Sequence, residues 1–379
     1  MRTVLCAEGP VEPQAALERY FELHPPTTLD PVHLVFGMRR SAPSLPHPVG
    51  PECFTVGSYM PGRGLKHVQP LTYHRQSYSE ICRSLADRSF QPDVLITCVT
   101  PPDDDGQRSL GGVNGYLDPV VALAPRIFAE EVSWLPRIRG ATVVTDVDDV
   151  VTSRTSDSDE QPPFSAAFDA VDEAVARQVA RLIPTAPRLA LGIGRVNDAL
   201  ALQLAGRGDV EILTGVLTEA VRKMYESGAI GGATMRAMSV IGSPSLLRWA
   251  ASCDDVRLLP STKIHNPAWL SQHDRFVAVL GAIDLDCAGN INSERAGDST
   301  ISGRGGAVDF ARGAHGSPGG LSIVALRSSD RNGVSRLVQH VSDPSINSDV
   351  IDAVVTEKGS AIITHLDTDE RRRALSTIF

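Results

Sequence analysis

The sequence lacks the features of a membrane-spanning, disulfide-bonded or metal-binding protein. No stretch of its 379 residues approaches eighteen consecutive apolar residues, which excludes a membrane-spanning helix. The six cysteines are scattered without a CxxC pair, and the ten histidines form no HExxH pattern, so we expect neither a disulfide framework nor a metal site. The chain reaches Glu8 before any long apolar run, so we expect no signal peptide and a cytoplasmic protein.

Basic charge is also scarce. Lysine and arginine together number 36 against 45 acidic residues, which gives a formal charge of −9. Such a surface repels phosphate backbones, so we expect no nucleic-acid partner. The hydrophobic fraction of 42% and the charged fraction of 21% are ordinary for a globular protein. The length favours two domains.

Several common catalytic and nucleotide-binding motifs are absent. There is no GxxxxGK[ST] loop, which argues against ordinary ATP or GTP hydrolysis. The run from Gly303 to Val308 has two correctly spaced glycines of a dinucleotide fingerprint, but Val308 stands at the third position. His315 occupies the first glycine position of a GxSxG elbow around Ser317.

The first half of the chain alternates short apolar runs with turn signals. Residues 93–99 and 141–145 read as buried strands, and residues 119–129 have the spacing of a helix between them. Residues 40–70 are rich in proline and glycine, which predicts a long irregular stretch. A strand, a helix and a second strand at this interval predict a parallel α/β architecture.

A Ser-, Asp- and Pro-rich segment, residues 152–163, reads as a linker. An amphipathic helix is predicted after it, over residues 168–182, followed by further strands at 188–192, 276–280, 322–326 and 353–355. We therefore predict two sequential α/β domains, residues 1–185 and 186–379.

Two glycine-rich segments are the candidates for ligand binding. Gly192, Ile193 and Gly194 follow a predicted strand and precede a predicted helix, so they form either a turn that binds an anion or a thioester oxygen, or an ordinary tight turn. Residues 302–320 hold seven glycines in nineteen positions, and Arg304 and Arg312 could supply charge for phosphates.

The second segment resembles the SGxGGQxDFxxGAxxSxGG signature of the acetyl-CoA hydrolase/transferase family, which includes the 4-hydroxybutyrate and acetate CoA-transferases. Four more segments resemble motifs of this family in the same order, and a fifth is close to its VVTEYG motif: PPDDDGQRSLG at 101–111, LGIG at 191–194, ESGAI at 226–230, the IDLDCAGNINSE run at 283–294, and VVTEKG at 354–359. The resemblance covers nearly the whole chain.

The resemblance implies two tandem, related α/β domains of the CoA-transferase type, with an active-site cleft between them. It also implies coenzyme A or an acyl-CoA as substrate, with no metal, bound mainly by the second domain. The candidate CoA-binding residues are Gly303, Arg304, Gly305, Gly306, Arg312 and Gly313. The turn at Gly192, Ile193 and Gly194 would face the thioester oxygen. A homodimer is left open.

Family transferases use a glutamate as nucleophile, at a fixed distance after the LGIG turn. Counted without gaps, Gly215 stands at that position, and a glycine cannot form the acyl anhydride. Glu219 lies one helical turn later and would replace the glutamate only if the register slipped by four residues.

Other residues could still act in the reaction. Glu294 matches the acid of the family's NSE motif and is either a general base for water or an anchor of the glycine-rich loop; we favour the anchor. Asp309 reads as structural, and a loop histidine such as His315 is more often incidental. We expect an acyl-CoA enzyme with hydrolytic or rearranging chemistry. The alternatives are CoA transfer through Glu219 and a non-catalytic acyl-CoA-binding protein.

Overall fold

The computed structural model describes all residues except 47–49, 124, 159–166 and 233. The described chain forms two compact units that alternate along the sequence. Unit 1 comprises residues 1–162, 238–262 and 300–305, and unit 2 comprises residues 163–237, 263–299 and 306–379. The predicted linker at 152–163 lies partly outside the described residues, and the predicted domain boundary near residue 185 stays a prediction.

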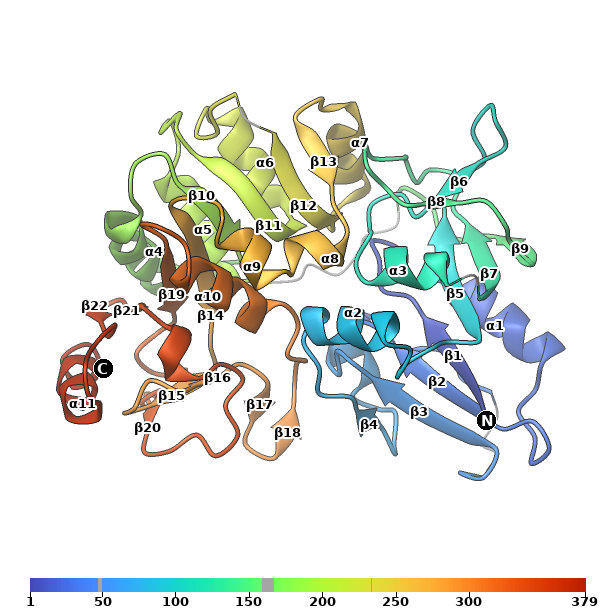
Figure 1. The fold of residues 1–379 in the computed structure, drawn as a ribbon, viewed down its shortest axis with the longest axis horizontal. Coiled ribbons are helices and arrows are strands. Elements are labelled where there is room, and N and C mark those ends of the chain that lie inside the picture. The colour runs from blue at the N-terminus through green and yellow to red at the C-terminus, as the bar shows by residue number, and fades with distance from the viewer. Residues whose placement is uncertain (47–49, 124, 159–166, 233) are drawn as a thin grey trace. The chain divides into compact units, whose positions relative to one another are not determined.

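Unit 1 is built on a parallel sheet, drawn in blue to green in Figure 1. Its seven strands run in the order β4-β3-β2-β1-β5-β7-β9. They are β1 (Arg2–Cys6), β2 (Val32–Phe36), β3 (Phe54–Ser58), β4 (Thr72–Tyr73), β5 (Val94–Val99), β7 (Arg126–Glu131) and β9 (Asp149–Thr152). A two-stranded sheet pairs β6 (Arg108–Ser109) with β8 (Val143–Val144). The order reverses between β1 and β5, which is the topological switch point of such a sheet.

Unit 1 also contains helices. They are α1 (Gln14–Leu23), α2 (Tyr78–Ala86), α3 (Leu117–Ala122) and α7 (Pro244–Ser252), with a 3-10 turn η1 (Arg63–Leu65) and a further strand β13 (Val256–Leu258). Helix α2 begins with a capping box, in which Ser77 accepts from the Glu80 amide and Glu80 accepts from the Ser77 amide.

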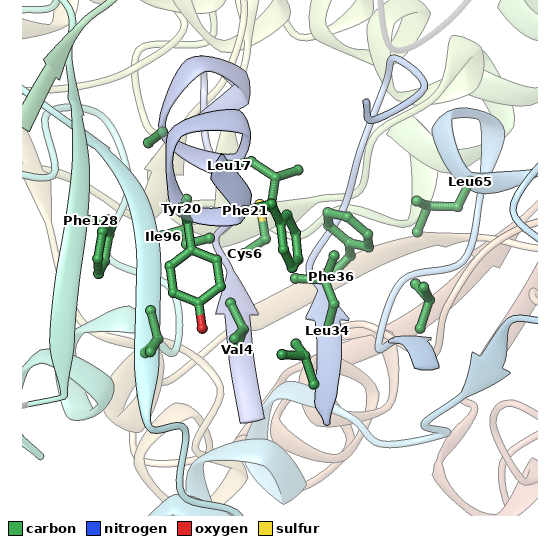
Figure 2. Packing of buried hydrophobic residues seen from close by; sticks show 14 residues of the cluster. Val4, Cys6, Leu17, Tyr20, Phe21, Leu34, Phe36, Leu65, Ile96 and Phe128 are labelled. Atoms are coloured by element: carbon green, nitrogen blue, oxygen red, sulfur yellow. The ribbon is translucent and has the colours of Figure 1, made fainter. Parts of the chain in front are cut away.

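The core of unit 1 lies where α1 packs on the parallel sheet. Figure 2 shows Leu17, Tyr20 and Phe21 of α1 facing Val4 of β1 and strand β2. The Tyr20 ring meets Phe128 of β7 edge-on, with the ring centroids 5.0 Å apart. Burial of these large apolar side chains accounts for the amphipathic pattern of α1.

Three predictions for the first half of the chain need correction. The helix predicted over 119–129 is α3 followed by strand β7, because Pro125 lacks an amide proton and disfavours helix before it. The strand predicted at 141–145 is only β8, paired antiparallel with β6. Strand β3 lies inside the stretch predicted to be irregular.

Unit 2 is built on a second sheet, in which neighbouring strands follow the order β12-β11-β10-β14-β19-β21-β22. They are β12 (Met235–Val240), whose last three residues are counted with unit 1, β11 (Glu211–Leu217), β10 (Arg188–Leu191), β14 (Phe276–Gly281), β19 (Leu321–Ala325), β21 (Ala353–Thr356) and β22 (Gly359–Ile362). Strand β10 is parallel to β11 and β14, so the order reverses beside β10, as it does beside β1 in unit 1.

Helices and minor strands complete unit 2. The helices are α4 (Ala170–Leu182), α5 (Arg195–Gln203), α6 (Glu219–Glu226), α9 (Pro267–Leu270), α10 (Ala307–His315) and α11 (Thr368–Ser376), with η2 (Ser348–Val350). Helix α8 (Ser261–Ile264) and the pair β17 (Arg295–Ala296) and β18 (Ser299–Thr300) cross between the two units. A small sheet joins β16 (Ile291–Asn292), β15 (Asp284–Asp286) and β20 (Leu337–Val338).

The predicted α/β class with parallel sheets is confirmed. Helix α4 and strands β10, β14, β19 and β21 lie where the sequence predicted them. Within the described residues, no helix combines the length and the apolar character needed to cross a bilayer.

Candidate functional site

The glycine turn predicted to bind an anion lies at the carboxyl end of β10, beside the switch point of the unit 2 sheet. Ligands of open α/β sheets bind at this edge. The Gly192 amide donates a hydrogen bond to the Val279 carbonyl of β14, at 3.1 Å, so it is already engaged. Ile193 is partly exposed, and Gly194 has φ +148° with no atom within 4 Å of the position that a Cβ would take. The turn is therefore open at its second half.

A polar side chain lies behind the turn. Asn197, in the first turn of α5, is 5% exposed, and its Oδ1 has no hydrogen-bond partner among the described residues. Its Nδ2 lies 3.2 Å from the position that a Cβ of Gly192 would take. Gly281, at the end of β14, likewise has open space around its Cβ position. These residues leave room for a ligand atom at the edge of the sheet.

Gly215 lies in β11, next to the same edge. The strand register pairs Leu189 with Ile212, and the same offset carries Gly192 to Gly215. Thr214 fixes this register, because its Oγ1 donates to the Leu191 carbonyl at 3.0 Å. Gly215 is buried, and the register places it in β11, the strand next to the one that ends at the glycine turn.

Two aromatic side chains limit the space beside Gly215. A Cβ at this position would lie 3.2 Å from Cε2 of Phe310 and 3.6 Å from the His265 ring. The two rings pack edge-on, with centroids 4.9 Å apart. A side chain longer than alanine would have to displace one of them or pass beside them.

His265 is a residue that the sequence analysis missed. It is 2% exposed, and burial lowers its pKa to about 3, so the imidazole is neutral at ordinary pH. Its Nδ1 lies 3.7 Å from Oδ2 of the fully buried Asp309 in α10. His265 lies between two short helices and outside any motif, and only the fold brings it beside Gly215.

The glycine-rich segment crosses from unit 1 to unit 2, and three of its glycines are explained by packing within their own unit. A Cβ at Gly303 would lie 2.2 Å from the Tyr59 carbonyl, and one at Gly306 would lie 1.9 Å from Cε1 of His265. A Cβ at Gly313 would lie 2.5 Å from Leu270. These three positions therefore require glycine for close approach of the protein to itself.

The remaining residues of this segment differ in exposure. Gly305 has φ +54°, and its carbonyl accepts a hydrogen bond from the Tyr78 amide at 3.1 Å. Arg304 forms an ion pair with Glu80, with 3.4 Å between Nη1 and Oε2. Arg312 is exposed on the last turn of α10 and has no ion-pair partner among the described residues. Of the two predicted phosphate-binding arginines, Arg312 is thus the accessible one.

The two candidate carboxylates lie on different elements. Glu219 is half-buried at the start of α6, directly after β11. Glu294 is 2% exposed and follows β16 of the small sheet, where its amide donates to Asn292 Oδ1.

The other two residues considered in the sequence lie in α10. Asp309 is buried, and His315 Nδ1 lies 2.8 Å from Asp352 Oδ1. Within the described residues, no group of three or more His, Cys, Asp or Glu side chains is placed to hold a metal ion.

Comparison with known proteins gives a consistent result. Residues 242–378 match the acetyl-CoA hydrolase/transferase C-terminal domain. The chain is 29% identical over 314 residues to the 4-hydroxybutyrate coenzyme A transferase of Clostridium kluyveri, a match that covers 79% of this chain and 72% of that protein.

Solved structures share the fold. RipA from Yersinia pestis superposes with a TM-score of 0.84 at 21% identity, over 100% of this chain and 91% of that one. A 4-hydroxybutyrate CoA-transferase from Porphyromonas gingivalis gives a TM-score of 0.77 at 22% identity, over 99% and 89% of the two chains. At these identities the likeness establishes the fold.

Proposed function

We propose that this chain, which is similar to acetyl-CoA hydrolases and CoA-transferases over the matches given above, cleaves or rearranges an acyl-CoA thioester without storing CoA on a glutamate. It is an enzyme that processes acyl-CoA. The single observation that carries the finer proposal is Gly215, which lies where the resemblance puts the nucleophile and has no side chain to form a covalent intermediate.

The surroundings of Gly215 support this proposal. Phe310 and His265 fill the space that the first atoms of a longer side chain would enter, so the glycine is accommodated by its neighbours. Their packing would leave little room for a protein carboxylate at this position, so water would attack the substrate directly. The resulting chemistry is attack by water on the thioester carbon, with breakage of the carbon–sulfur bond and release of CoA as the thiol.

The open turn supplies the group that such a reaction needs. Attack on the thioester places negative charge on its carbonyl oxygen, and donors aimed at that oxygen stabilise the transition state. We assign this role to the turn at Ile193 and Gly194, beside the first turn of α5. The Gly192 amide does not take part, because its hydrogen bond to the Val279 carbonyl attaches the turn to β14.

The base that removes the proton from water is one of the two carboxylates. Glu294 is the base candidate that the sequence offers, and we add Glu219, which the sequence offers as a replacement nucleophile, as a second candidate for this role. His265 does not fit this role, because an imidazole with a pKa of about 3 accepts a proton poorly at neutral pH. We assign it to holding Phe310 and the start of α10 in place, and we assign Arg312 to the phosphates of CoA.

Steady-state assays separate the two reactions. The purified chain is incubated with a panel of acyl-CoA esters, and thiol release is compared with incorporation of labelled acetate into acetyl-CoA. We expect thiol release without acetate-dependent exchange. Gly215→Glu is compared with Gly215→Gln, whose side chain has the shape of glutamate but no carboxylate. Only Gly215→Glu should gain exchange. Acetate exchange by the wild-type chain would show that a shifted carboxylate such as Glu219 is the nucleophile. Saturable binding of CoA esters without turnover of any of them would leave a non-catalytic acyl-CoA-binding protein.

A further inference from the structure

Two histidines meet at the edge of the unit 1 sheet, apart from the residues assigned above. His33 lies in β2, and His74 follows β4. Their Nε2 atoms face each other at 3.2 Å, and their ring planes are nearly perpendicular, at 84°. Both side chains are partly exposed, so a dissolved ion can reach them.

The strand between them is shaped for this meeting. Strand β3 separates β2 from β4, and Gly57 of β3 is the residue over which the two rings approach. A Cβ at Gly57 would lie 2.3 Å from His74 Nε2 and 3.2 Å from His33 Cε1. Any other residue at position 57 would therefore push the imidazoles apart.

A third residue orients one of the rings. Thr55 Oγ1 lies 2.8 Å from His33 Nδ1, and Thr55 and His33 are paired in the β2–β3 register. A hydrogen bond from Nδ1–H to this hydroxyl leaves the lone pair of His33 on Nε2, where it accepts a hydrogen bond from His74 Nε2–H; a metal ion would replace that hydrogen bond once the His74 proton moves to its Nδ1. Metal-binding histidines usually have such a partner on the other ring nitrogen.

We propose that His33 and His74 form a two-imidazole site for a divalent transition-metal ion such as Zn²⁺, Cu²⁺ or Ni²⁺. Two nitrogen ligands of a tetrahedral Zn²⁺ lie about 3.3 Å apart, close to the observed separation of 3.2 Å. Imidazole nitrogens suit these ions, whereas Mg²⁺ and Ca²⁺ prefer oxygen ligands. With two protein ligands, water or a small external ligand completes the coordination, so the site binds metal reversibly and independently of the acyl-CoA chemistry.

Isothermal titration of tag-free, full-length protein with ZnCl₂ tests the site. We expect one saturable site per chain in the wild type and at least a tenfold loss of affinity in His33→Ala and in His74→Ala. Thr55→Val removes the orienting hydroxyl and should weaken binding about tenfold. His67→Ala, an exposed histidine of the same unit, is the matched control and should bind as the wild type does.

A second measurement does not depend on the variants folding. The electron paramagnetic resonance spectrum of the wild-type chain with one equivalent of Cu²⁺ should show coupling to two imidazole nitrogens. Absence of saturable Zn²⁺ binding, a Cu²⁺ spectrum without coordinated nitrogen, or affinity that is unchanged in both histidine variants would overturn the proposal.

Discussion

Each of the two main sheets has a topological switch point of its own, beside β1 in unit 1 and beside β10 in unit 2. The residues at these two edges differ. After β1, Glu8 is 3% exposed; its Oε1 accepts a hydrogen bond from the Tyr78 hydroxyl at 2.6 Å and its Oε2 accepts one from the Met38 amide at 3.2 Å. After β10, the turn at Gly194 faces open space, and Asn197 Oδ1 is unsatisfied within the described chain. Within its own unit, the edge after β1 is filled by side chains, whereas the edge after β10 is more open.

The glycines near the two edges repeat this difference. A Cβ at Gly37, which follows β2, would lie 2.6 Å from the Tyr116 hydroxyl and 2.8 Å from Glu8 Cβ, whereas one at Gly194 or Gly281 would meet nothing within 4 Å. The same topology thus occurs twice, and the side chains near each switch point decide how much of its edge they fill. Predictions that break or sharpen this comparison follow from the groups at each edge.

The largest expected effect is the pH dependence of stability contributed by His265. The unfolded chain binds a proton at this imidazole below its ordinary pKa of 6.5, while the folded chain resists it down to about pH 3. Its contribution is therefore complete above pH 6.5 and falls by roughly 1.4 kcal/mol for each pH unit below that, down to about pH 3. Urea unfolding between pH 4 and pH 7 should show a shallower slope for His265→Asn than for the wild type. Equal slopes would mean that His265 is not buried as described.

Gly306→Ala should be the next largest effect. The new Cβ would lie 1.9 Å from Cε1 of the buried His265, so we expect a loss of about 3 kcal/mol in the free energy of unfolding. Gly281→Ala is the matched control, because its Cβ has open space, and it should change stability by less than about 0.5 kcal/mol. Chemical denaturation measures both, and equal effects of the two substitutions would refute the packing explanation for Gly306.

Glu8→Ala tests whether the unit 1 edge is structural. It leaves the buried Tyr78 hydroxyl and the Met38 amide without their acceptor, which should cost about 2 kcal/mol of stability. Affinity for acyl-CoA should stay unchanged, since we place the ligand in unit 2. A variant of normal stability that no longer binds acyl-CoA would assign the ligand to the unit 1 edge instead.

Glu8 also gives a pH dependence opposite to that of His265. Burial raises the pKa of its carboxyl above the ordinary value of 4.5, so the folded chain keeps a proton that the unfolded chain releases. Stability should therefore decrease as the pH rises above 4.5 until the folded carboxyl ionises. Glu8→Gln should remove this decrease in the same urea experiments.

The smallest expected effect on stability is that of Arg312→Ala. This exposed side chain has no ion-pair partner in the described chain, so the free energy of unfolding should change by less than about 0.5 kcal/mol. If Arg312 contacts the phosphates of CoA, KM for acyl-CoA should rise about tenfold with kcat retained. Arg312→Lys keeps the charge and should recover part of this loss. An unchanged KM would remove Arg312 from the proposed site.

Much of the fold could be predicted from the sequence where the local signal and the tertiary structure agree. The β-branched run at 94–99 and the periodicity of α4 gave elements close to those observed. The helix predicted over 119–129 failed because residues 126–131 pair with β5 along their whole length, and a single-sequence pattern cannot show such long-range pairing.

The candidate site shows the same limit. The turn at Gly192–Gly194 could be found from its position after a strand, because that relation is local. His265 could not be found, since it reaches Gly215 and Asp309 only through strand order and the packing of α10. The glycine-rich segment was interpreted as a ligand loop from its glycine content and from its resemblance to a family signature. The structure shows that Gly303, Gly306 and Gly313 are also needed for internal packing.

The most direct test of the central proposal is intact mass spectrometry of the wild-type chain after incubation with acetyl-CoA. With Gly215 at the nucleophile position, we predict an unmodified mass while free CoA thiol accumulates. Gly215→Gln, which adds side-chain length without a carboxylate, should also stay unmodified. A covalent CoA adduct on Glu219, Glu294 or any other glutamate of the wild-type chain would contradict the account.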